Sequence, residues 1–109
     1  MAKTLLDAAT ATGASVSVTM HKKPSRHTFQ VTMGGTVVAT AVTVDVEASL
    51  DDITYFTLVS HALSAGEIAA EGAMFHLVDM PVKYIRANLT TLTGGTAPTV
   101  TVKHVWSEI

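Results

Sequence analysis

The sequence predicts an all-β protein, an antiparallel β-sandwich or jelly roll of about seven or eight strands. Two observations support this fold class. Short segments alternate apolar and polar residues, as strands do when one face of their sheet is buried and the other is exposed. Turn signals rich in Gly, Pro, Asp and Ser separate these segments at intervals of roughly 8–12 residues, and none of the segments is convincing as a crossover helix.

The N-terminal residues 1–14 predict an extended arm that leads into the sheet. A helix over residues 5–11 is an alternative, but the Thr-rich run up to Gly13 would end it within two turns. A helix of that length is unstable unless it is packed against other elements. We therefore expect the arm to precede one sandwich domain of residues 15–109.

The first two strands are expected over residues 15–20 and 28–33, separated by a loop. Pro24 lies in this loop and excludes a continuing central strand. In the second strand the inward residues are Phe29, Val31 and Met33. The Gly34-Gly35 pair that follows provides a turn.

Residues 36–50 form a long alternating run, which predicts a strand with a bend or bulge near residues 39–41. The apolar residues expected on one face are Val42, Val44, Val46, Ala48 and Leu50. Asp51-Asp52 closes this run as a turn, and residues 53–60 predict the next strand. Tyr55 and Phe56 are adjacent there, so we expect one on each face.

Residues 61–72 predict a loop or one short turn, although Ser64 and Glu67 have the spacing of a capping box. Residues 73–78 predict a strand, and residues 79–81 a turn or sheet edge. Last come two alternating segments, 83–90 and 98–106, joined by a connection that contains Gly94-Gly95. This arrangement is typical of a β-hairpin.

The composition favours a protein that works by assembly. Only 15% of its 109 residues are charged, against about 25% in a typical soluble domain, and the mean hydropathy is +0.37. Seventeen threonines supply much of the polar surface. These features suit a homo-oligomer or a protein whose faces are covered by neighbours, although a thermally robust monomer would have the same composition.

Charge and compartment limit the partners. The net charge of −2 provides no general attraction to nucleic acid or to an anionic membrane, so we expect neither as a partner. No apolar stretch reaches the roughly 20 residues of a membrane span, and the first residues lack the apolar core of a signal peptide. We therefore expect the product to be made in the cytoplasm and kept there, unless lysis releases it.

We expect no enzyme, metal or cofactor. The chain has no cysteine, and its five histidines lack the spacing of a metal site. His104 shares a strand face with apolar residues, which favours a packed, hydrogen-bonded histidine. Asp45 and Glu47 share a face without a visible substrate cleft, so we interpret them as solvated or interfacial. Asp51-Asp52 lacks the dense ligand pattern of a calcium loop, and a turn is the simpler interpretation.

The whole pattern resembles small β-sandwich structural proteins of tailed bacteriophages. The residues that carry the resemblance lie at 5–13, 28–32, 42–52, 55–58, 81–89 and 94–102. In those proteins a VEGSLDG-x-x-WF-x-L segment precedes KYIRANVT and a final TVTV strand, which this chain matches with VEASLDD, KYIRANLT and TVTV. It departs from the pattern at residues 51–55, where the Gly turn and the Trp are missing. Similar patterns occur in galactose-binding-like jelly rolls.

The resemblance implies a virion protein on the capsid surface, a decoration or cement protein that binds between major capsid protein subunits. The candidate partner contacts are Leu5, Leu6, Lys22, Lys23 and Arg26. The first two lie in the arm and the others in a basic loop, and both segments could become ordered on binding.

Two alternatives to the decoration role stay open. One is a carbohydrate-binding jelly roll associated with a tail or fibre, for which Tyr55, Tyr84 and Trp106 would be the sugar platforms. The other is a ring subunit of the tail or neck.

Overall fold

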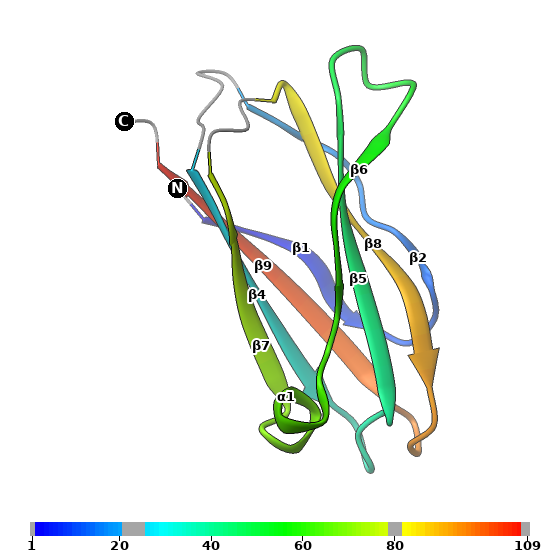
Figure 1. Ribbon diagram of the computed structural model, residues 1–109. Helices are drawn as coiled ribbons and strands as arrows, with labels where there is room; N and C mark the ends of the chain where they lie inside the picture. Colours follow the sequence, from blue (N-terminus) through cyan, green and yellow to red (C-terminus); the bar gives the residue numbers. More distant parts are fainter. Residues whose placement is uncertain (1, 21–25, 79–81, 108–109) are drawn as a thin grey trace.

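A computed structural model describes residues 2–20, 26–78 and 82–107. Within these residues two antiparallel sheets pack as a β-sandwich, which confirms the predicted fold class (Figure 1). Sheet A has the order β1-β9-β4-β7, and sheet B has the order β2-β8-β5-β6, with β3 also paired to β8. The strands are β1 (Ala2–Ala9), β2 (Gly13–Ala14), β3 (Val18–Thr19), β4 (Arg26–Gly34), β5 (Ala41–Ser49), β6 (Phe56–Ala62), β7 (Gly72–Leu77), β8 (Tyr84–Thr93) and β9 (Thr99–Ser107). The described residues thus form nine strands rather than seven or eight, because residues 2–9 add β1 and residues 13–14 add β2, while residues 15–20 contribute only the two-residue β3.

The core lies between the two sheets and is built by alternate residues of the central strands. Sheet A contributes Phe29, Val31, Val100 and Val102, and sheet B contributes Val42, Val44, Val46, Ile85, Ala87 and Leu89, all of them almost fully buried. The alternation predicted for residues 28–33 and for Val42 to Ala48 is therefore confirmed. Burial of one such aliphatic side chain contributes about 1.5–3 kcal/mol, so these rows supply much of the driving force for folding.

The predicted hairpin between residues 83–90 and 98–106 is wrong. β8 pairs with β5 in sheet B, whereas β9 pairs with β4 and β1 in sheet A. The connection between them crosses from one sheet to the other, and it pairs with the β4–β5 connection through the bridge Val37↔Thr96. Gly95 has φ +77°, and a Cβ there would lie 2.5 Å from the carbonyl oxygen of Val37. The glycine is therefore needed for a close approach between two crossing loops.

The N-terminal residues differ from the predicted arm. Residues 2–9 form β1, which pairs along β9 as an edge strand of sheet A. Two register shifts interrupt this pairing, one between Thr4 and Leu6 and one between Leu6 and Ala9. A shifted register disrupts the simple alternation of apolar and polar residues, so the strand leaves no clear pattern in the sequence.

The segment after β6 contains a helix of five residues, α1 (Ala65–Ala69). The capping box is present, because the Ser64 hydroxyl accepts from the Glu67 amide and the Glu67 carboxylate accepts from the Ser64 amide. Ile68 packs against the core and provides the tertiary support that so short a helix requires. The predicted turn at residues 79–81 lies outside the described residues.

Candidate functional site

An unusual group of exposed apolar side chains lies in the β5–β6 connection and at the first residue of β6. Leu50, Ile53 and Phe56 are 76%, 83% and 70% exposed, and we call these three residues the apolar tip. Figure 1 shows this connection projecting at one end of the sandwich, opposite the end that carries α1. The expectation that Leu50 shares the buried face of Val42 to Ala48 is wrong, because β5 ends at Ser49 and the chain turns before Leu50 could pack inward.

Hydrogen bonds within the turn hold the apolar tip outward. The buried Ser49 hydroxyl accepts from the backbone amides of Asp51 and Asp52 at 3.1 and 3.0 Å. It also donates to Asp51 Oδ1 at 2.7 Å. Asp51 Oδ1 accepts in addition from the amides of Ile53 and Thr54, both at 2.9 Å. The predicted turn at Asp51-Asp52 is therefore a closed set of side-chain to backbone bonds, as Ser and Asp make in such positions.

The electrostatics of the turn favour the ionised form of Asp51. The amides of Thr54 and Ile53 and the Ser49 hydroxyl stabilise its negative charge and lower the pKa of Asp51 to about 2. The carboxylate is thus fully charged near neutral pH. The turn therefore keeps its hydrogen-bond acceptor at any pH well above 2.

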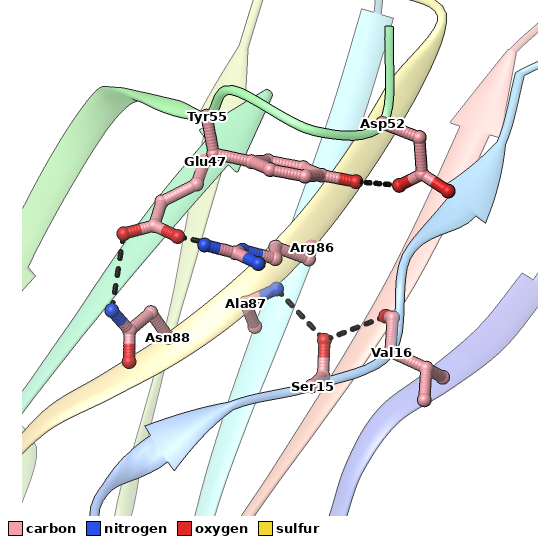
Figure 2. Close-up of polar contacts among 8 residues, drawn as sticks. All are labelled: Ser15, Val16, Glu47, Asp52, Tyr55, Arg86, Ala87 and Asn88. Carbon is pink, nitrogen blue, oxygen red and sulfur yellow. Dashed lines mark hydrogen bonds and ion pairs between the residues drawn. The ribbon is translucent and has the colours of Figure 1, made fainter. Parts of the chain in front are cut away.

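A second network on the outer face of sheet B braces the base of the turn (Figure 2). The Tyr55 hydroxyl donates to Asp52 Oδ1, and the Arg86 guanidinium lies 3.8 Å from the centroid of the Tyr55 ring. Arg86 Nε donates to Glu47 Oε1 at 2.7 Å, and Asn88 Nδ2 donates to Glu47 Oε2 at 3.0 Å. The Glu47 carboxylate is therefore occupied by a structural ion pair.

The same network changes the titration of two of its members. Burial, followed by the hydrogen bond to Asp52, raises the pKa of the Tyr55 hydroxyl. Hydrogen bonds from the Tyr55 and Ser17 hydroxyls lower the pKa of Asp52. Both shifts favour the state in which a neutral Tyr55 donates to a charged Asp52. The turn therefore has two supports, one made by its own backbone and one that reaches across to β8.

A shallow cleft of about 380 Å³ lies beside the apolar tip. Leu50, Phe56, Leu58 and Val82 contribute its apolar wall, and Asp51 and Thr54 lie at its polar side. The tip and the cleft together offer both a projecting and a receiving apolar surface. Contiguous exposed apolar surface of this kind marks interaction sites on soluble proteins.

The structure does not bring the predicted partner contacts together. Leu5 is 7% exposed and belongs to the core, so its side chain is not accessible to a partner, and Leu6 is half-buried against the same core. This follows from the pairing of β1 with β9, which buries the leucines that an unpaired arm would expose. Arg26 is exposed at the start of β4, while Lys22 and Lys23 lie outside the described residues. The sequence signal that could have found the apolar tip is the placement of Leu50 and Ile53 on either side of a turn-forming Asp pair.

Two of the five histidines form a buried pair. His104 and His27 are both buried and share a hydrogen bond of 2.9 Å between Nε2 and Nδ1. His104 stacks on Phe29 with ring centroids 4.6 Å apart, which confirms the prediction of a packed, hydrogen-bonded histidine. Burial, with the proximity of His27 as a smaller cause, lowers the pKa of His104 to about 3. Among the described residues, no group of three or more His, Asp or Glu side chains could hold a metal ion.

Two of the candidate sugar platforms, Tyr55 and Trp106, lie against different sheets. Tyr55 covers Arg86 at the outer face of sheet B, whereas Trp106 is half-buried in sheet A, where it packs against the core and lies close to His104. Tyr84 lies in β8 with the Lys83 ammonium 5.5 Å from its ring centroid. The described part of the chain therefore does not assemble Tyr55 and Trp106 into one aromatic platform.

Comparisons with known proteins identify the fold. No protein-family model matches the chain, and no curated protein matches it in sequence. The SPBc2 prophage-derived protein YomS has a similar structure, with a TM-score of 0.64 and 13% identity over 95% of this chain and 88% of that chain. The PBSX exported protein XepA is also similar, with a TM-score of 0.59 and 12% identity. The match covers 95% of this chain but only 36% of the XepA chain. At these identities the property shared with the two neighbours is the β-sandwich fold.

Within the residues that the structure covers, no helix has the length and apolar character needed to cross a membrane.

Proposed function

We propose that this chain is a structural protein of a phage particle, of the capsid decoration or cement type, that attaches through its apolar tip. Its role would be adhesion between major capsid protein subunits, with no chemical step. The observation that carries the proposal is the tip, where three large apolar side chains project from a turn held by its own hydrogen bonds. A turn that is already ordered loses little conformational entropy when a partner covers it.

The phage setting is supported by the fold and by the composition. The solved neighbours with this sandwich, YomS and XepA, are phage-derived proteins, and the chain itself resembles phage structural proteins in its strand motifs. The low charge content suits a protein that is surrounded by neighbours. A capsid lattice would provide repeated apolar grooves of one shape, into which one rigid tip could fit many times.

The binding free energy of one apolar tip is too small to hold the protein on a phage particle by itself. Burial of three side chains that are about three-quarters exposed contributes on the order of 5 kcal/mol. Association of two proteins costs at least about 4 kcal/mol in lost rigid-body freedom. One tip would therefore bind weakly, and retention on a particle would depend on several tips acting together. This supports the expectation that the protein functions as a homo-oligomer.

The proposal is tested with expanded capsids that lack the protein. Purified wild type is added, and bound copies per capsid and the capsid melting temperature are measured. We expect saturation at a fixed number of copies with a raised melting temperature. Ile53→Asp should weaken binding at least 10-fold, because it introduces a charge into the apolar contact. Val37→Asp is the matched control. Like Ile53, Val37 is an exposed β-branched apolar residue, 53% exposed, but it lies in the β4–β5 connection away from the apolar tip.

Other outcomes would select the alternatives. Absence of saturable binding to capsids, or equal binding by Ile53→Asp and wild type, would contradict attachment through the tip. Binding to purified tails or necks but not to capsids would support the ring-subunit alternative. Retention on a glycan array without binding to particles would move the function to carbohydrate recognition.

A further inference from the structure

We propose that the edge strand β6 is a self-association surface, which pairs antiparallel with β6 of a second copy across a two-fold axis near Ser60. β6 is the terminal strand of sheet B, and no described strand pairs with its outer side. Two-fold pairing would join two copies of sheet B into one continuous sheet. This inference concerns the edge of β6 and does not depend on what the apolar tip binds.

The direction of the backbone groups on β6 follows from its pairing with β5. The Leu63 amide donates to the Val42 carbonyl at 3.0 Å, so these two residues form a hydrogen-bonded pair. Hydrogen-bonded and non-hydrogen-bonded pairs alternate along an antiparallel ladder. In the continuous register, Ser60 opposite Asp45 and Ala62 opposite Thr43 are therefore non-hydrogen-bonded pairs. Their N–H and C=O groups point away from β5 and form a free edge.

The edge formed by β6 lacks the usual protection against strand pairing. Natural edge strands carry charges or prolines, or they are very short. The sequence of β6, Phe-Thr-Leu-Val-Ser-His-Ala, contains neither a proline nor a Lys, Arg, Asp or Glu, and a single register shift near Leu58 is its only irregularity. Most of the other edges are protected: β1 contains Lys3 and Asp7 and has two register shifts, and β2 and β3 have two residues each. β7 also lacks charged residues, but it is contacted by α1.

The chemistry of β6 points to a second copy of this chain as its occupant. An antiparallel pair of identical strands is self-complementary, because the symmetry places Ser60 opposite Ser60 and Ala62 opposite Leu58 of the second copy. The side chains near the axis are small or apolar apart from His61, which this register places opposite Val59 of the second copy. The nearest acidic residue, Asp45, lies opposite Ser60 on β5, so in the dimer the two β6 strands lie between the Asp45 side chains of the two copies. Glu67 accepts from the Ser64 amide at 2.8 Å and lies 3.1 Å from His61 Nε2 within one copy.

The test measures the mass of the full chain in solution by sedimentation at about 1 to 100 μM. We expect a concentration-dependent dimer for wild type and for Ser60→Ala, which keeps the backbone N–H. Ser60→Pro removes an N–H that β5 does not use, so it should leave the fold intact and give a monomer. Ser60→Lys places two like charges at the axis and should also give a monomer. An equimolar mixture of Ser60→Lys and Ser60→Asp should restore the dimer through opposite charges.

A cross-linking experiment gives an independent result. The chain has no cysteine, so Ser60→Cys provides a single thiol. Residues opposite each other in a hydrogen-bonded antiparallel pair have Cα atoms about 5.5 Å apart, within the range of a disulfide. Mild oxidation should therefore link Ser60→Cys into covalent dimers, whereas Thr32→Cys, on the exposed face of sheet A, should not be cross-linked. A wild-type monomer at 100 μM, or an oligomer that persists in both Ser60→Pro and Ser60→Lys, would overturn the proposal.

Discussion

Mild acid should destabilise the fold through His104. The imidazole is fully buried against His27 and Phe29, and its pKa is about 3 in the folded protein against 6.5 in an unfolded chain. Because the folded pKa is lowered, the unfolded chain binds a proton more readily between these two values. The stability provided by neutral His104 is therefore fully present above pH 6.5 and is lost progressively as the pH falls toward 3.

The magnitude follows from the same pKa values. A pH of 5 is about 1.5 units below the pKa of the imidazole in the unfolded chain. Each unit corresponds to 1.36 kcal/mol, so the free energy of unfolding falls by about 2 kcal/mol relative to pH 7. The Asp51 carboxylate, with a pKa of about 2, does not contribute over this interval. A loss of this size is a substantial part of the stability of a small domain.

The assay is urea unfolding at pH 7 and pH 5, followed by the fluorescence of Trp106, the only tryptophan in the chain. In His104→Gln residue 104 cannot titrate but keeps a polar group for His27, so this variant should lose clearly less stability than wild type between the two pH values. His76→Gln is the matched control, because His76 is exposed on β7 and hydrogen-bonds Thr28. The reasoning is refuted if wild type loses less than about 0.5 kcal/mol, or if His104→Gln loses as much as wild type.

Three further outcomes test the turn and the core. Ser49→Ala should cost about 1–3 kcal/mol in urea unfolding, because two backbone amides lose their acceptor; no loss would mean that water replaces the hydroxyl without cost. Since the folded pKa of Asp51 is lowered, its stabilising charge is present above pH 3.8 and lost as the pH falls toward 2. The Thr54 amide should lose protection against hydrogen exchange over that window, after correction for the intrinsic pH dependence of exchange. Its protection would stay constant if Asp51 were not its acceptor. Val44→Ala should cost about 2–3 kcal/mol, because it leaves a cavity between the sheets, while Gln30→Ala on the exposed face should stay within about 0.5 kcal/mol, and equal losses would contradict the assigned burial.

The candidate site shows where inference from the sequence stops. The Ser and Asp residues of the turn could be identified, since their short side chains bond to nearby backbone and the interaction is local. The exposure of Leu50 could not, because the alternation that places Val46 and Ala48 inward continues through it. Whether the chain leaves the sheet at Ser49 or continues through Leu50 depends on where β6 begins to pair with β5.

The partners of the buried residues are likewise a tertiary property. The sequence places His104 on an apolar strand face, but it places His27 in the loop before the strand predicted over residues 28–33. Only the pairing of β4 with β9 brings the two rings together in the core. Leu5 is buried for a similar reason, since β9 accepts β1 as a neighbour on its other side.

The all-β class and most of the inward residues of the central strands follow from the sequence alone, because the two-residue period of a strand is a local property that any amphipathic sheet must obey. The sequence does not determine which strands are neighbours. The inward faces of both sheets are equally apolar and meet in one core, so the pattern of β8 followed by β9 is the same for a hairpin and for a crossing between sheets. The tertiary structure decides between them through the long-range pairs that β5 makes with β8 and β4 makes with β9. The same long-range packing ends β5 at Ser49 and leaves the apolar tip in solvent.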